Sequence, residues 1–101
     1  MNVKGYLDPV VLAVLSAGPL HGYAVIEELK QRSGGAFELA EGTVYPVLHR
    51  LESDGLLSSA WSTAAGRRRR VYRLTRRGRA ALAAQRTEWA RFAHAVDAVL
   101  A

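Results

Sequence analysis

The sequence GRRRRVYRLT, residues 66–75, places four consecutive arginines between a glycine and a strand-like run. Val71, Tyr72 and Leu74 in that run are of types that favour β-strands or apolar surfaces. A guanidinium can donate two parallel hydrogen bonds to one phosphate, which lysine cannot do. The stretch predicts a basic loop tip anchored by a strand, or else a solvated charge run, and its flanks decide between the two.

The flanks favour the anchored loop. Residues 56–63 and 69–75 are expected to be extended segments, separated by residues 64–66, and together they predict a β-hairpin with a basic tip. A last helix is expected from about Thr75, a suitable N-cap, to about Leu100. Its apolar residues recur at spacings of three, four and seven, with Gln85 as the polar exception; they are Leu82, Trp89, Phe92, Val96 and Val99.

Three shorter helices are expected before the hairpin. The first begins with Asp8 as N-cap and Pro9 at the first helical position, and ends at residues 18–19, Gly-Pro. The second covers about residues 21–33, and residues 37–39 then suggest a short extended piece.

The third helix is expected to cover about residues 41–54. Val44, Leu48 and Leu51 mark its core face, and the opposite face is small, polar and cationic. Pro46 fits only if the helix begins late, because deeper in a helix a proline removes a backbone hydrogen bond.

Composition limits the classes of protein. A chain of 101 residues can form one domain with a modest core, and without cysteines it can hold no disulfide. No apolar run approaches a membrane span and no secretory signal is evident, so a cytoplasmic protein is expected. The three histidines are far apart in sequence and no catalytic motif is present, so we expect no metal, no cofactor and no enzyme.

Charge is distributed unevenly along the chain. Residues 1–57 carry four basic and seven acidic side chains, a net charge of −3. Residues 58–101 carry ten arginines and two acids, a net charge of +8. The second half is therefore expected to face an anionic partner, and its arginine-rich β segment favours nucleic acid over a membrane surface.

Three short helices followed by a basic hairpin predict a winged helix-turn-helix, a mainly α fold with a small β-hairpin (α+β). In that design the third helix enters the DNA major groove and the hairpin, the wing, contacts the backbone or minor groove. We expect residues 1–75 to form the DNA-binding domain and residues 76–101 a dimerisation helix packed in the same compact unit.

The chain closely resembles the PadR family of bacterial transcriptional regulators. The resemblance rests on residues 18–23 (GPLHGY), 42–52 (GTVYPVLHRLE), 55–57 (GLL) and 66–75, with Gly78. It implies a homodimer that represses transcription from a partly palindromic operator in double-stranded DNA, with the last helix as the dimer interface. The sequence departs from the family at residues 40–41, where relatives have Ser-Pro, and at Arg68 and Val71, where proline and tyrosine are commoner.

The expected DNA contacts lie on the wing, the third helix and the start of the second. Thr43 and Tyr45 are expected to bind phosphate, whereas His49 and Arg50 could read bases, although Arg50 could instead pair with Asp54. Tyr23 could bind phosphate or pack in the core. The full set of DNA-binding candidates is Tyr23, Thr43, Tyr45, Pro46, His49, Arg50, Gly66, Arg67, Arg68 and Arg69.

Trp89 and Phe92 have two interpretations. As members of the apolar row they would pack in a dimer interface. Some members of the PadR family bind flat aromatic effectors in the dimer's central pore, so the resemblance also implies a small aromatic effector stacked on these rings. Two other functions stay open: a winged helix that acts mainly through protein contacts, and an RNA-binding domain, which would need more exposed aromatic rings than Tyr45 alone.

Overall fold

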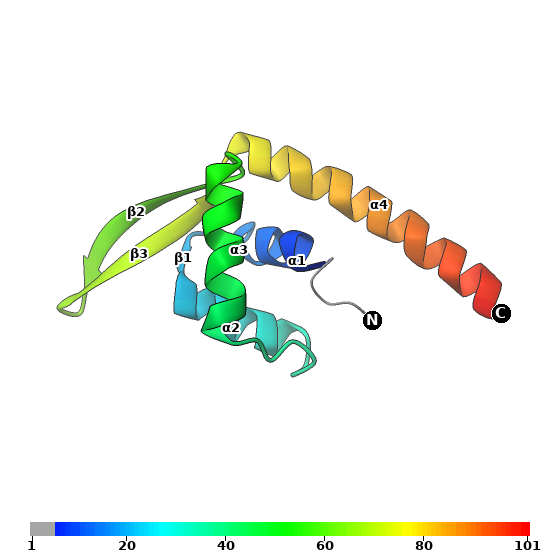
Figure 1. The fold of residues 1–101 in the computed structure, drawn as a ribbon, viewed down its shortest axis with the longest axis horizontal. Coiled ribbons are helices and arrows are strands. Elements are labelled where there is room, and N and C mark those ends of the chain that lie inside the picture. Colours follow the sequence, from blue (N-terminus) through cyan, green and yellow to red (C-terminus); the bar gives the residue numbers. More distant parts are fainter. Residues whose placement is uncertain (1–5) are drawn as a thin grey trace.

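A computed structural model describes residues 6–101 of the chain, and it confirms the expected fold class (Figure 1). Three short helices precede a β-hairpin and a long last helix. The elements are α1 (Leu7–Leu15), β1 (Leu20–His21), α2 (Gly22–Arg32), α3 (Glu41–Ser53), β2 (Leu57–Ala64), β3 (Arg67–Leu74) and α4 (Arg76–Leu100).

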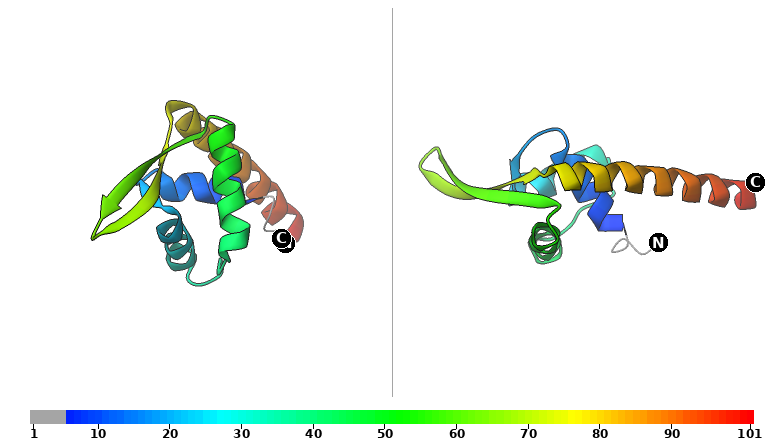
Figure 2. Two further views of the ribbon diagram at one scale, coloured as in Figure 1. Left: turned by 60° about the vertical axis from the view of Figure 1, so that its left-hand side comes forward. Right: turned by 90° about the horizontal axis from the view of Figure 1, so that it is seen from above.

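One hydrophobic core holds the three-helix body together. Val11 and Leu12 of α1 are completely buried, as are Val44, Leu48 and Leu51, the predicted core face of α3. The inner end of the hairpin closes this core with other buried apolar side chains, Leu57, Tyr72 and Leu74. The sheet is thereby fixed to the helices at one end, while its other end reaches into solvent (Figure 2).

The start of α1 differs from the prediction. The helix begins at Leu7 with Tyr6 at the N-cap position and no side-chain cap, so the assignment of Asp8 as N-cap is wrong. Pro9 is still tolerated because the first-turn N–H groups have no intrahelical partner. Asp8 lies inside the first turn, where its carboxylate is free to reach another element.

The third helix begins at Glu41, so Pro46 lies inside it rather than in its first turn. Because proline has no N–H, α3 lacks the backbone hydrogen bond that residue 46 would otherwise donate to the carbonyl of Gly42. Pro46 itself is exposed on the outer face of the helix. Residues 37–39, expected to be extended, form no strand.

The sheet has three strands rather than the two of the predicted hairpin. The two-residue strand β1 pairs antiparallel with β3, giving the order β1-β3-β2. The hairpin strands are offset from the prediction and meet at a two-residue turn, Ala65-Gly66, both with positive φ (52° and 74°). Positive φ at both central positions is the requirement of the type I′ turn, whose twist matches that of paired strands.

The long helix α4 begins as predicted. Thr75 caps it, since its Oγ1 accepts a hydrogen bond from the Gly78 N–H (2.9 Å) and donates one to the Gly55 carbonyl (2.7 Å). Leu82 packs into the core, but the outer part of α4 projects from the body on the side away from the wing (Figure 2). Among residues 6–101, no helix is both long and apolar enough to cross a membrane.

Candidate nucleic-acid interface

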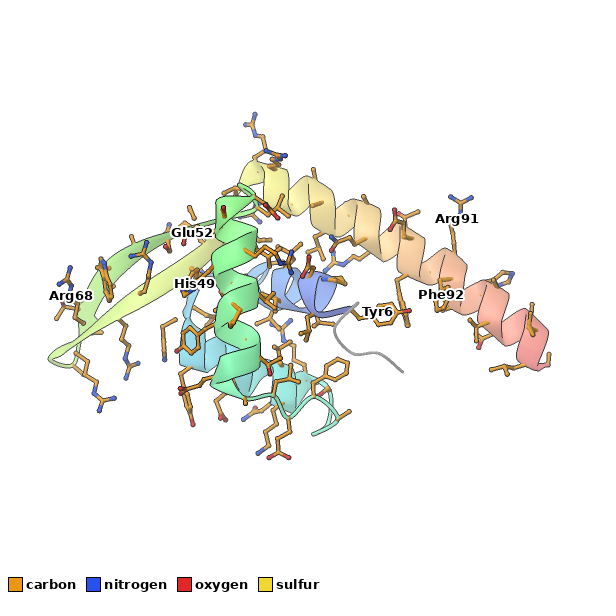
Figure 3. The ribbon with its side chains drawn as sticks, in the orientation of Figure 1. Tyr6, His49, Glu52, Arg68, Arg91 and Phe92 are labelled. Atoms are coloured by element: carbon orange, nitrogen blue, oxygen red, sulfur yellow. The ribbon has the colours of Figure 1, made fainter. Side chains whose placement is uncertain are left out.

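The outer face of α3 is small, polar and open. Pro46 and His49 are exposed on it, whereas Thr43 and Tyr45 at its margins are half-buried. Figure 3 shows His49 on the side of α3 that faces away from α1. No bulky apolar side chain covers this face in the described chain, so a flat polar surface such as a groove floor can approach it closely.

Tyr45 lies against the start of α2. A Cβ built on Gly22 would come within 2.5 Å of the Tyr45 ring and 2.8 Å of its hydroxyl oxygen, so a larger residue at position 22 would displace the Tyr45 side chain. This contact fixes the Tyr45 side chain beside the first backbone N–H groups of α2. Those N–H groups favour anions, as helix N-termini do.

Arg50 is held by α1. Both guanidinium NH groups donate to the Asp8 carboxylate, at 3.0 and 2.5 Å, whereas Asp54, the partner considered from sequence, is 4.0 Å away. The hydrogen bond and charge of Asp8 raise the pKa of Arg50. The side chain stays half-exposed, at 52%, so the pair ties α3 to α1 without removing Arg50 from the surface.

The four wing arginines are divided between the two faces of the sheet. The register pairs Arg70 with Trp61 and Arg68 with Thr63 on one face, and alternation places Arg67 and Arg69 on the other. The predicted cluster is thus two pairs of guanidinium groups on a narrow ribbon.

Arg70 is built into the fold. Its Nε donates to the Ser59 hydroxyl (2.8 Å), and Ser59 in turn donates to the Glu52 carboxylate of α3. The Arg70 guanidinium also lies 3.8 Å from Glu52. This network connects the wing to α3 and sets the position of one relative to the other.

Arg69 contacts the strand β1. Its NH1 lies 3.2 Å from the Nε2 of His21. Partial burial, and then the positive charge of Arg69, lower the pKa of His21. The neutral imidazole therefore accepts from the guanidinium and steadies it.

These side chains surround one open hollow of about 370 Å³ between the wing and α2. Four arginines and a histidine contribute to its walls, and none of its lining residues is acidic. The lining is His21, Gly22, Tyr23, Tyr45, Trp61, Arg67, Arg68, Arg69 and Arg70. Such a site suits a phosphate group.

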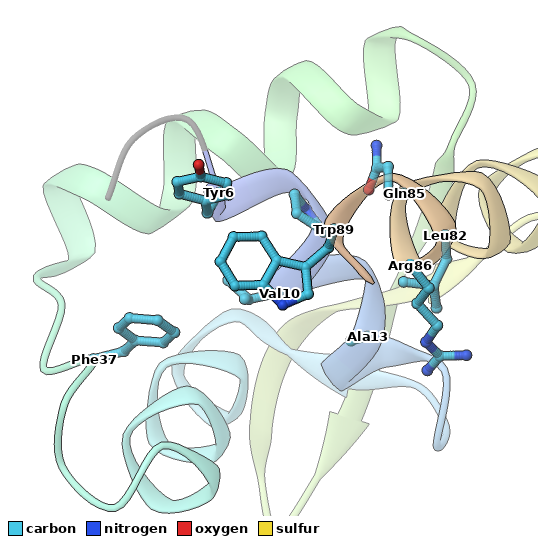
Figure 4. A pocket seen from close by; sticks show the side chains of 9 residues that line it. Tyr6, Val10, Ala13, Phe37, Leu82, Gln85, Arg86 and Trp89 are labelled. Atoms are coloured by element: carbon cyan, nitrogen blue, oxygen red, sulfur yellow. The ribbon is translucent and has the colours of Figure 1, made fainter. Parts of the chain in front are cut away.

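A second, apolar hollow of about 360 Å³ lies on the opposite side of the body, between α1 and α4 (Figure 4). Trp89 and Tyr6 meet edge to face in its wall, with ring centroids 5.0 Å apart, and Phe92 stands 5.8 Å from Trp89. Trp89 and Phe92 are about half exposed, and Val96 and Val99 of the same row further along α4 are exposed as well. The structure thus groups the predicted interface residues on one side of the projecting helix.

Sequence reasoning missed four residues that shape the wing and α3. Trp61 lies within the extended segment expected at residues 56–63, and an exposed tryptophan beside arginines is a recognisable signal. Asp8 was read as a cap, and its partner Arg50 is 42 residues away. Gly22 and His21 depend on contacts between elements that no local pattern reveals.

In the described part of the chain, no cluster of three or more potential metal ligands occurs. The arginine, hydroxyl and backbone N–H groups described above can bind anions. The hollow beside Trp89 is apolar and lined by aromatic rings.

Comparison with known proteins places these features in one family. The model of the transcriptional regulator PadR-like family matches residues 11–84. The transcriptional regulator Rv3488 of Mycobacterium tuberculosis is 48% identical over 67 residues, which cover 66% of this chain and 60% of that protein.

Solved structures agree with the sequence matches. A PadR family transcription regulator from Clostridium difficile R20291 superposes with a TM-score of 0.84 at 31% identity, covering 95% of this chain and 99% of the other. A transcriptional regulator from Clostridium thermocellum gives a TM-score of 0.86 at 25% identity, covering 94% and 93%.

Proposed function

Since this chain belongs to the PadR-like family of transcriptional regulators, we propose that it is a homodimeric repressor that binds a partly palindromic DNA operator. The observation that carries the proposal is the basic, acid-free hollow between the wing and α2, next to the open outer face of α3. Residues 1–75 would serve as the DNA-binding domain and residues 76–101 as the dimerisation helix.

In this mechanism a dimer places two α3 helices in successive major grooves, about 34–36 Å apart. Pro46, His49 and Arg50 face the groove floor, and Gly66 lets the wing tip turn beside the flanking backbone. Tyr23, Thr43, Tyr45 and the wing residues Arg67, Arg68 and Arg69 bind phosphates. Repression follows because the occupied site excludes the transcription machinery.

The wing is tested by the salt dependence of DNA binding. Each neutralised phosphate contributes about −0.9 to the slope of log K against log salt concentration. We expect Arg67→Ala with Arg68→Ala to reduce the magnitude of that slope by about one to two units. Arg79→Ala with Arg91→Ala is the matched control, since it removes equal charge from α4. Equal slopes for wild type and the wing variant would exclude the wing from DNA binding.

The α3 face is tested by sequence selection from a random DNA pool. Arg50→Ala is expected to broaden the selected sequence more than it changes the salt slope, because base contacts specify and phosphate contacts position. Asp8→Asn frees Arg50 from its bidentate partner. It would sharpen the choice of bases if Arg50 reads them, and leave the selected sequence unchanged if Arg50 serves only the α1–α3 contact.

An effector is proposed for the apolar hollow beside Trp89 and Phe92. A flat aromatic compound stacked there would change the angle between the two DNA-binding units and lower the affinity for DNA. The test uses a Trp61→Phe variant, in which Trp89 is the remaining tryptophan. If planar aromatic compounds neither quench its fluorescence nor release DNA, this part of the proposal is wrong.

A further inference from the structure

Trp61 lies on the wing and is 54% exposed. Two guanidinium groups approach that ring. The Cζ of Arg68 lies 4.6 Å from the ring centroid, and the Cζ of Arg70 lies 5.4 Å from it. Both distances are within the range of cation–π attraction, so the ring is a platform shared by two cations.

The two arginines on this platform are not equivalent. Arg70 already donates to Ser59 and lies near the Glu52 carboxylate, so its charge is engaged. Arg68 takes part in none of the ion pairs found among residues 6–101, and its contact with Trp61 is the one side-chain interaction identified for it. Figure 3 shows Arg68 near the outer end of the hairpin.

We propose that Trp61 is a positioning residue that holds Arg68 ready to bind a DNA backbone phosphate at the hollow between the wing and α2. The inference rests on the proposed DNA-binding function. Trp61 thereby joins the residues that determine DNA affinity, although it carries no charge and makes no hydrogen bond to the phosphate.

The physical reason lies in the geometry of the guanidinium. A guanidinium that packs against an aromatic face keeps its N–H edges free to fork onto an anion, whereas a carboxylate partner would occupy those edges. Packing also restricts a side chain that otherwise loses much rotamer freedom when it binds. Since Trp61 is neutral, it orders Arg68 without cancelling the charge that attracts DNA.

The test is a double-mutant cycle between Trp61 and Arg68. Trp61→Leu keeps apolar bulk on the strand but removes the aromatic face, and Trp61→Tyr restores part of it. Binding is measured by anisotropy with a fluorescein-labelled mixed-sequence duplex of about 30 base pairs, long enough for two half-sites, over a series of salt concentrations.

Trp61→Leu is expected to weaken binding about two- to fivefold, the range of an exposed cation–π contact, and Trp61→Tyr less. The salt slope stays unchanged in Trp61→Leu, whereas Arg68→Ala reduces its magnitude by about one. The combined variant binds no more weakly than Arg68→Ala alone. Arg67→Ala, on the other face of the sheet, is the matched control, and its effect adds to that of Trp61→Leu.

Additive effects of Trp61→Leu and Arg68→Ala would overturn the inference, since they would mean that Trp61 contacts DNA directly or only stabilises the hairpin. A thermal melt of each variant reports the hairpin's stability separately. If wild type binds duplex DNA with a steep salt slope while the cycle is additive, only this inference fails. If wild type shows no salt-dependent binding, the proposed function fails with it.

Discussion

Gly78 stands where the first turn of α4 crosses the backbone of Leu56. A Cβ at this position would lie 2.0 Å from the Leu56 carbonyl oxygen, which also accepts a hydrogen bond from the Thr75 N–H. Because the clash is with backbone, no side-chain movement relieves it. Because Gly78 has no Cβ, α4 can pack this closely against the backbone at the base of the wing.

Gly78→Ala is therefore expected to lower the free energy of unfolding by about 2–3 kcal/mol, as overpacking does, despite the better helix propensity of alanine. The matched control is Gly42→Ala in α3, where an added Cβ meets nothing within 4 Å. That change is expected to be neutral or to stabilise by up to about 1 kcal/mol. Urea titrations of both variants measure their free energies of unfolding. A Gly78→Ala variant as stable as the wild type would contradict the close approach of Gly78 to the Leu56 backbone.

His21 makes stability depend on pH. Its pKa in the folded chain is lowered, by partial burial first and by Arg69 second, so the folded state binds its proton less readily than the unfolded state. The contribution is present in full above the ordinary histidine pKa of about 6.5 and declines as the pH falls below it.

We expect thermal stability to fall between pH 7.5 and 5 more in wild type than in His21→Gln, which keeps a hydrogen-bonding side chain but does not titrate. NMR titration of His21 provides the direct measurement. A midpoint above the ordinary histidine value would show that Arg69 does not face the ring in solution.

The sequence predicts the hairpin correctly as an element, but its strands and turn lie at slightly different residues than expected. Alternating residues identified two strands, but the three-residue link expected from residues 64–66 is a two-residue turn with Ala65 at φ 52°. Alanine avoids that region, whereas asparagine tolerates it, so the local signal for the turn was weak.

Ala65→Asn should therefore raise the free energy of unfolding by about 0.5–1 kcal/mol, because Asn-Gly is the preferred type I′ pair. The melting temperature should rise, while the salt slope of DNA binding should not change because no charge is added. Gly66→Ala, which places a second alanine at positive φ, is the opposing control and should lower the melting temperature.

A single chain leaves a row of apolar side chains exposed along α4. Its dimensions of 54 × 28 × 21 Å reflect a helix that extends well beyond the core, with Phe92, Val96 and Val99 exposed by 51%, 36% and 84%. Apolar residues repeated on one side of an extended helix gain free energy by packing against another such surface.

Val96→Glu is expected to shift the protein toward a monomer of 11.0 kDa, since two like charges would meet near a two-fold axis. Ala98→Glu, an equal change at an exposed position on the opposite side of α4, should leave the mass unchanged. Sedimentation equilibrium measures both. If the wild-type protein is itself a monomer at all concentrations, the dimer proposal is wrong.

Local patterns were sufficient for the order and type of the helices, the hairpin, the core face of α3 and the Thr75 cap. Each depends on residues within about one turn or one strand of each other, where periodicity and capping act directly. The same patterns identified the candidate surface residues, whose contacts with DNA remain predictions.

Other features depend on contacts between residues distant in sequence. The pairing of Asp8 with Arg50, the fit of Tyr45 over Gly22 and the pairing of β1 with β3 all join elements that are far apart in the chain. A carboxylate at a helix start has the same local signature whether it caps that helix or pairs with another. Such choices are made by packing, because only the folded chain brings the competing partners within reach of each other.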